Sequence, residues 1–375
     1  MTPQPEATRR PHRAPCWAVF QELGQALERR WDAADRDERA FPALAEAALA
    51  EAAPHLRTTM PELLEGALFL DRLPPQRLRP FGQPPLNLYV GEGFYIEANL
   101  WMDGTTTIHE HGFSGAFCLL AGRSLHARYV FHEDERICAR LRLGRMEPRA
   151  LELLAAGQVR RIEAGSRLIH AAFHLDRPSV SVVVRTESDP ECGPQLDYLP
   201  PGVAVDPRPP PEPWRTRLAV LDTLALLDPV AHQAALMRLL RTANRPWTHQ
   251  LLAGALRRLG DGAAFAAVAA VAAERHPRFA ALVVAALREA ARQEALIARR
   301  ATLREDEDRL LLALLAVALS RDALYEVLAT ASPEAPEDWL LRGLARLAQR
   351  DAAALRLVPA NLIPDELTDA WKGVR

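Results

Sequence analysis

The residues from Leu86 to about Tyr198 alternate short β-rich pieces with turn signals, and this pattern limits the possible folds more than any other feature of the chain. The pieces are rich in valine, isoleucine, threonine and aromatic residues, while glycine, proline and aspartate separate them. Short strands at this spacing predict a barrel or jelly roll. The predicted strands are residues 86–90, 94–101, 105–111, 116–120, 125–131, 159–162, 168–175 and 180–186, with one helix at 147–156.

Helical patterns flank this β-rich zone on both sides. In residues 16–67, Phe20, Leu23, Leu27 and Trp31 recur at helical spacing. After a proline-rich stretch, long Ala/Leu/Arg runs continue to about residue 357, in helix pairs that suggest a solenoid-like array. We therefore predict an α+β multidomain chain. Its parts are an N-terminal helical segment (1–70), a β-barrel (71–199), a Pro-rich linker (200–213) and an all-α, helical-repeat-like domain (214–375).

Charge and composition argue against two classes of partner. The formal net charge of -2 at pH 7 is not that of a strongly basic nucleic-acid binder. No apolar run free of charges reaches membrane-spanning length, and the first fifteen residues carry no apolar core of a secretion signal. The four cysteines are widely spread and form no CxxC pair. We expect a cytoplasmic protein that binds neither nucleic acid nor a membrane.

Site chemistry is concentrated in two short histidine-bearing stretches. His109 and His111 are two residues apart in a strand-forming run, so both side chains point to the same face. His170 and His174 are four residues apart in a second apolar run and would also share a face. Because neutral imidazole is the commonest ligand for first-row divalent metals, we predict a metal site with open coordination positions. His126 and His132 have no partner at ligand spacing and are interpreted as ordinary half-buried residues.

These stretches resemble the two motifs of the cupin superfamily. Residues 101–111, followed by Gly122, are similar to the first motif, and residues 165–174 are similar to the second. The resemblance covers residues 86–190 and is nearest to the three-histidine, cysteine-dioxygenase-like metal cupins. It implies that His109, His111 and His170 are the metal ligands, while His174 lies in a position that usually holds asparagine and lines the pocket. The alternative third ligand is His174.

The sequence also departs from that family's pattern. No glutamate ligand follows the first histidine pair, Ala116 stands where a cross-linking cysteine is usual, and Arg185 stands where a tyrosine is usual. Without a glutamate, the metal charge is less compensated, which favours an anionic substrate. Arg185 shares strand parity with Ser181 and Val183, so it would either anchor that substrate inside the barrel or form a surface ion pair at the strand end.

The predicted activity is that of a mononuclear non-haem Fe(II) dioxygenase, acting with O₂ on a small anionic substrate or a peptide side chain. His109, His111 and His170 would hold the metal, and Arg185 and His174 would serve the substrate. One alternative is a Zn-, Ni- or Mn-dependent isomerase or hydrolase on the same barrel. Another is a non-catalytic sensor or scaffold whose helical domain recruits a protein partner. A shared fold does not choose among these chemistries.

Overall fold

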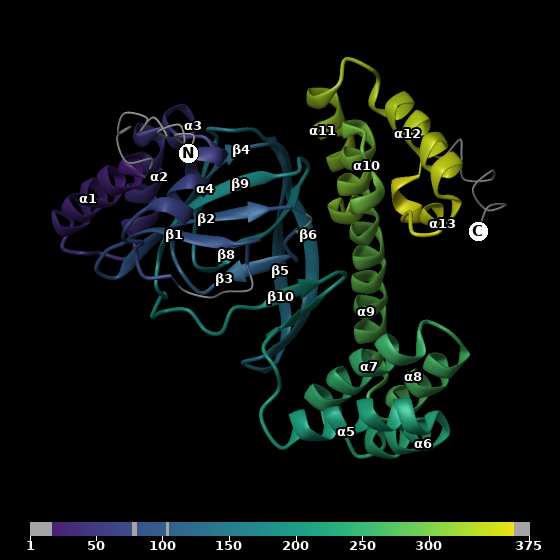
Figure 1. The fold of residues 1–375 in the computed structure, drawn as a ribbon. Helices are drawn as coiled ribbons and strands as arrows, with labels where there is room; N and C mark the ends of the chain where they lie inside the picture. The colour runs from purple at the N-terminus through teal and green to yellow at the C-terminus, as the bar shows by residue number, and fades with distance from the viewer. Residues whose placement is uncertain (1–16, 77–80, 103–104, 364–375) are drawn as a thin grey trace, which may run out of the picture.

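A computed structural model describes residues 17–76, 81–102 and 105–363 of the chain (Figure 1). Strands form the centre of the N-terminal half, and helices form the C-terminal half. The outer ends of the predicted helical zones, 1–16 and 364–375, lie outside the described residues.

Four N-terminal helices cover one side of the strand region. The apolar residues at helical spacing, Phe20, Leu23, Leu27 and Trp31, are all buried, as the pattern predicts. They belong to a core that also includes the outward-facing side chains of the neighbouring sheet. The helices are α1 (Ala18–Asp32), α2 (Phe41–Ala52), α3 (Pro54–Arg57) and α4 (Met60–Phe69).

The described strands form two sheets. One has five strands in the order β1-β2-β9-β4-β7, and the other is a closed six-stranded barrel in the order β10-β11-β6-β5-β8-β3. The strands are β1 (Pro85–Val90), β2 (Phe94–Trp101), β3 (His109–His111), β4 (Gly115–Ala121), β5 (Ser124–Cys138), β6 (Leu141–Leu154), β7 (Val159–Ile162), β8 (Gly165–His174), β9 (Ser179–Thr186), β10 (Asp197–Leu199) and β11 (Val203–Val205).

Strand alternation gives the five-stranded sheet two different faces. On β2, Ile96 and Ala98 belong to the core shared with the N-terminal helices. The residues between and beyond them, Glu97 and Asn99, line an internal cavity instead. Because side chains of a strand alternate between faces, the same short strand both anchors the sheet and supplies its polar inner wall.

The structure corrects two of the predicted elements. Residues 147–154 are not helical but belong to β6, which pairs with β5 over its whole length. Leu151 and Leu153 pack toward the helical region, whereas Leu154 lines the cavity, which is the alternation of a strand. The predicted linker at 200–213 begins inside the sheet, because Val203–Val205 forms β11 between β10 and β6.

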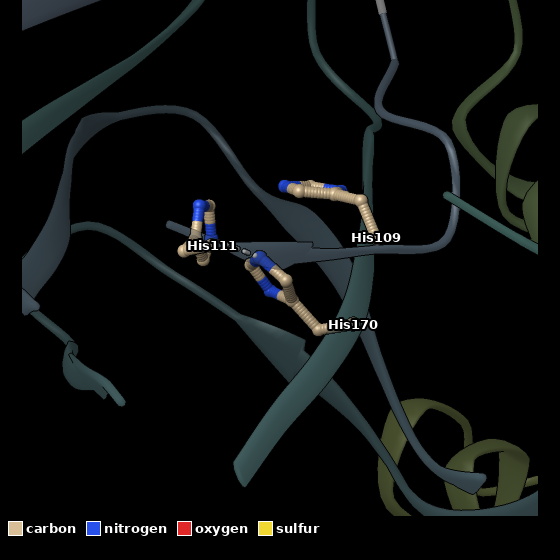
Figure 2. Close-up of side chains that lie close together, drawn as sticks. All are labelled: His109, His111 and His170. Carbon is tan, nitrogen blue, oxygen red and sulfur yellow. Dashed lines mark hydrogen bonds between the residues drawn. The ribbon is translucent and has the colours of Figure 1, made fainter. Parts of the chain in front are cut away.

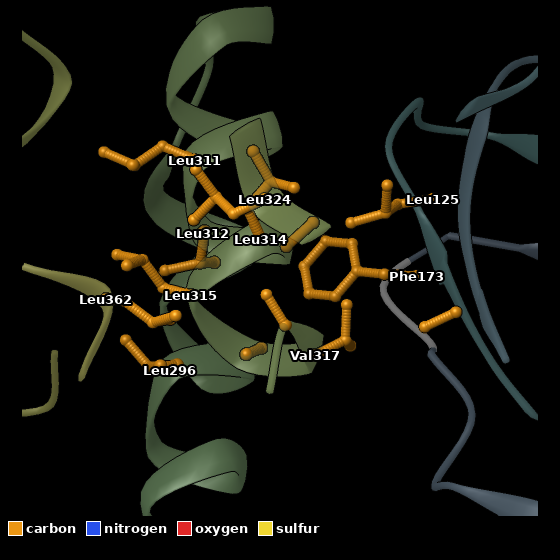
Figure 3. Close-up of a cluster of buried hydrophobic side chains, with 14 of the residues drawn as sticks. Leu125, Phe173, Leu296, Leu311, Leu312, Leu314, Leu315, Val317, Leu324 and Leu362 are labelled. Carbon is orange, nitrogen blue, oxygen red and sulfur yellow. The ribbon is translucent and has the colours of Figure 1, made fainter. Parts of the chain in front are cut away.

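The C-terminal helices pack on the outer face of the six-stranded sheet. Figure 3 shows Phe173 and Leu125 from the strands meeting leucines of α10 and its neighbours in one cluster. The Tyr129 hydroxyl donates a hydrogen bond of 2.5 Å to the carbonyl of Val317 at the end of α10. The helix array is therefore joined to the barrel through a buried interface. A regular repeat within it stays a prediction.

The long helix α9 connects two groups of C-terminal helices (Figure 1). In the described part of the chain, no helix combines the length and apolarity needed to cross a membrane. The elements are α5 (Trp214–Leu227), α6 (Pro229–Leu240), α7 (Arg245–Leu259), α8 (Ala263–Arg275), α9 (Pro277–Ala298), η1 (Arg299–Thr302), α10 (Asp306–Val317), α11 (Arg321–Ala331), α12 (Pro336–Arg350), α13 (Ala352–Leu355) and η2 (Ala360–Leu362).

Candidate metal centre and its cavity

Three histidines from two paired strands converge inside the barrel. His109 and His111 come from β3 and His170 from β8, with His109 and His170 in register across the two strands. Ligand nitrogens of the three side chains lie within 4.8 Å of one another, and Figure 2 shows the rings turned toward a common point. In the described part of the chain, this is the only group of His, Cys, Asp or Glu side chains close enough to hold a metal ion.

Burial keeps these imidazoles neutral. Loss of solvent lowers the pKa of His111 and of His170 well below its usual value, and the neighbouring histidines lower both further. Burial also lowers the pKa of His109. A neutral imidazole has one nitrogen lone pair available, so at neutral pH all three side chains are in the form that binds metals.

Hydrogen bonds fix the tautomers of two of the three rings. The Nδ1 of His109 lies 2.9 Å from the carbonyl oxygen of Thr107 and must therefore carry the proton, which leaves its Nε2 free to act as a ligand. The tautomer of His170 is fixed by two hydrogen bonds in series. Its Nδ1 lies 2.8 Å from Nε2 of His126, and Nδ1 of His126 lies 2.9 Å from a carboxylate oxygen of Glu152.

These two hydrogen bonds fix the proton positions on the rings one after the other. The Glu152 carboxylate only accepts, so His126 carries its proton on Nδ1 and presents an unprotonated Nε2 to His170. His170 must then carry its proton on Nδ1, which leaves its Nε2 lone pair toward the histidine cluster. Although burial would raise the pKa of Glu152, hydrogen bonds from His126 and Arg160 lower it, so the carboxylate is ionised.

The spacing of the His111 and His170 nitrogens is close to that expected around a divalent ion. The Nε2 atoms of His111 and His170 lie 2.8 Å apart. Two imidazoles bound to one ion at an angle of about 90°, each with a metal–nitrogen bond of about 2.1 Å, would have their nitrogens about 3.0 Å apart. Three neutral nitrogens facing one point, with Nδ1–H groups of two rings already bonded elsewhere, are the arrangement expected of a metal site.

Two interpretations of residues around the site need correction. His126 is not an ordinary half-buried residue, because its fully buried ring bridges His170 and Glu152. Glu110, between the two inward-facing histidines, does not line the cavity; it is buried and accepts a hydrogen bond from the Tyr198 hydroxyl. His132 is exposed rather than half-buried, and it pairs with Glu147 without a link to the site.

A cavity of about 350 Å³ lies between the two sheets and contains the histidine cluster in its wall. Its apolar part is formed by Phe113, Phe117, Leu119, Leu154, Ile162 and Val183. Its polar part, besides the histidines, includes Glu97, Asn99, Ser181 and Arg185. A largely apolar pocket with a few polar groups is typical of a small-molecule site.

Arg185 lines the cavity between the two sheets rather than forming a surface ion pair. Its side chain is 12% exposed, and the guanidinium carbon lies 3.2 Å from the centroid of the Phe113 ring. That ring also contacts His111, with centroids 4.5 Å apart, and the positive charge of Arg185 helps to lower the pKa of His111. The arginine is therefore next to the histidine cluster, in a position to contact a ligand there.

His174 lies on the same cavity wall but outside the three-histidine cluster. Its ring stacks on Trp101 with centroids 4.4 Å apart, and its Nδ1 lies 2.7 Å from the Ser124 hydroxyl. Its Nε2 is buried and has no partner among the described residues. Burial lowers the pKa of His174 to about 3. Its assignment as a residue that serves the substrate stays a prediction.

Comparison with known proteins gives distant structural similarities only. No protein-family model matches the chain, and no curated protein matches it. Among solved structures, DMSP lyase DddQ from Ruegeria pomeroyi is similar with 19% identity and a TM-score of 0.23, over 47% of this chain and 94% of that chain. A protein with a double-stranded beta-helix domain from Klebsiella pneumoniae shows 17% identity and a TM-score of 0.19, over 35% and 91%. An oxalate oxidase shows 19% identity and a TM-score of 0.23, over 44% and 79%.

Proposed function

We propose that the protein is a mononuclear non-haem iron oxygenase of the cupin type that acts with O₂ on a small anionic substrate. The observation that carries this proposal is the cluster of three buried, neutral imidazoles in the wall of the cavity between the two sheets. Fe(II) is the proposed metal, with zinc, nickel or manganese as alternatives. Three neutral nitrogen ligands leave positions open for O₂ and a chelating anion.

Different residues of the chain have different proposed roles at this site. His109, His111 and His170 would hold the metal, which when bound supplies Lewis acidity and positions for O₂ and substrate. Arg185 would bind an anionic group of the substrate, since a guanidinium pairs well with a carboxylate. The apolar wall would keep bulk water away from the reacting atoms. The cavity volume favours a small molecule over a peptide side chain.

The test is elemental analysis of anaerobically purified protein, followed by O₂ uptake measured with small thiols, amino acids and keto acids. We expect one iron per chain and O₂ consumption with a member of the panel. His132→Ala serves as the control, because this exposed histidine has no link to the cluster. Zinc or nickel without O₂ uptake would favour an isomerase or hydrolase. A protein that binds no metal would favour a sensor whose helical region recruits a protein partner.

A further inference from the structure

Glu97 is a buried carboxylate that faces the cavity without a donor of its own. It lies on β2, and its side chain is 7% exposed. Its nearest charged neighbour is Arg185, whose Nη1 lies 3.9 Å from the Glu97 Oε1. This separation is longer than a hydrogen bond, and no other described residue donates to the carboxylate. A buried carboxylate in this state is costly unless a further group compensates it.

A second acceptor on the same strand face is also unsatisfied. The Asn99 Oδ1 is buried, lines the cavity, and has no hydrogen-bond partner among the described residues. Glu97 and Asn99 are two residues apart on one face, so their Cα atoms lie about 6.6 Å apart along the strand. This part of the wall therefore offers acceptors to a ligand, whereas Arg185 beside it offers donors.

The two charges are held at a fixed spacing. The Arg185 guanidinium packs over the ring of Phe113 and lies 5.2 Å from the centroid of Tyr95. Strands β2 and β9 place Glu97 opposite Val183, which makes Arg185 its diagonal neighbour. In an α-amino acid, the amine nitrogen and the carboxylate carbon are about 2.5 Å apart, so one small molecule can reach both groups.

We propose that the cavity recognises a zwitterion, with its carboxylate on Arg185 and its protonated amine on Glu97 and Asn99. An ammonium group supplies three donors and a positive charge, and so matches an unsatisfied carboxylate and an unsatisfied amide oxygen. Both poles of the ligand are then bound by the five-stranded sheet, and the rest of the molecule extends toward the histidines on the other sheet. This inference rests on the proposed function for the role of the histidines, and it narrows the substrate to small amino acids.

The experiment compares each of the common amino acids with its 2-keto analogue by calorimetry on Zn(II)-loaded protein. The keto analogue keeps the carboxylate and loses the amine. We expect an amino acid to bind about tenfold or more tightly than its analogue, because a charge-assisted hydrogen bond is lost. If no amino acid binds, or if a keto analogue binds equally well, the inference is wrong.

Two variants distinguish recognition of the amine by Glu97 from a purely structural role of this residue. Glu97→Gln removes the charge, so it should weaken amino-acid binding while strengthening keto-acid binding, since the anion no longer faces a carboxylate. Glu97→Asp keeps the charge and should keep the preference for the amine. Equal changes for both ligand classes in Glu97→Gln would overturn the assignment. Glu92→Gln is the control, because Glu92 is exposed in the turn before β2.

The readouts separate this inference from the proposed function. Metal content and O₂ uptake test the iron oxygenase, whereas the calorimetry uses a redox-inactive ion and needs no turnover. If amino acids are preferred over keto acids in a protein that shows no O₂ uptake, the oxygenase proposal fails and the inference stands. If O₂ uptake occurs with keto acids alone, the inference fails and the oxygenase proposal stands.

Discussion

We expect His126 to affect metal affinity although it is not one of the three clustered histidines, and its substitution tests this. In His126→Phe, the ring shape is largely kept, but the acceptor for the Nδ1–H of His170 is lost. Without metal, His170 can move its proton to Nε2 and donate to His111, whose Nε2 lies 2.8 Å away. Metal binding forbids that tautomer, because it needs the Nε2 lone pair.

The free-energy cost of the His126→Phe substitution therefore falls on the metal-bound state. A buried N–H left without an acceptor costs about 1–3 kcal/mol, and each 1.4 kcal/mol corresponds to tenfold in affinity. We expect the dissociation constant for Zn(II) or Co(II) to rise about 10–100-fold, within the range known for groups that orient metal ligands. His126→Gln restores an acceptor and should recover part of the loss.

The assay is a competition titration against a chelator, with the visible spectrum of Co(II) as a second readout. His132→Phe is the matched control on the same strand, because its side chain is exposed and makes no contact with the cluster. An apo-protein melting curve shows whether each variant is folded. Wild-type metal affinity in a folded His126→Phe protein would refute the tautomer argument, as would an equal loss in His132→Phe.

Three further predictions concern the ligands and the anchor. The double variant His109→Ala/His111→Ala should lose its metal by elemental analysis, with a nearly unchanged far-ultraviolet helix signal because the helices lie outside the barrel. His170→Ala should cost far more metal affinity than His174→Ala, whose effect should stay within about 100-fold; equal losses in a chelator titration would reassign the third ligand. Arg185→Leu should weaken binding of carboxylate ligands at least tenfold, by about the energy of a charge-assisted hydrogen bond, while metal content stays normal, and unchanged calorimetry would exclude it as the anchor.

The sequence predicts β2, β4 and β9 to within one residue at each end, because runs of β-branched and aromatic residues between turn signals are recognisable locally. It fails at 147–154, because the run Ala150-Leu-Glu-Leu-Leu154 favours a helix locally, and pairing with β5 overrides that preference. The three-residue strands β10 and β11 are too short to show a pattern. Local propensity therefore predicts the wrong secondary structure where pairing with a distant strand determines it.

The candidate site divides in the same way. The His-x-His spacing and the second histidine stretch identify the side chains that converge, because both patterns are local. The contribution of His126 and Glu152 depends on how β5 registers against β8 and β6, which no local pattern contains. The sequence allows Glu97 to line the pocket or to lie in the core or at the surface, and the pairing of β2 within the sheet decides for the pocket. Side chains that act through a neighbour on another strand are thus the ones that sequence reasoning misses.

Because its polar groups are divided between two sheets, the cavity should select ligands by their length. The histidines belong to the closed six-stranded sheet, and Glu97 and Arg185 belong to the five-stranded sheet. Facing sheets are about 10 Å apart, so the distance between the two groups is fixed by packing and not by either group itself. A ligand that contacts both groups must match the length of that gap. We therefore expect weaker binding of homologous molecules that are one methylene longer or shorter, even though every polar contact remains available. Larger or smaller side chains in the apolar layer, such as Phe117 and Leu154, would then reset the accepted length without altering either set of polar residues.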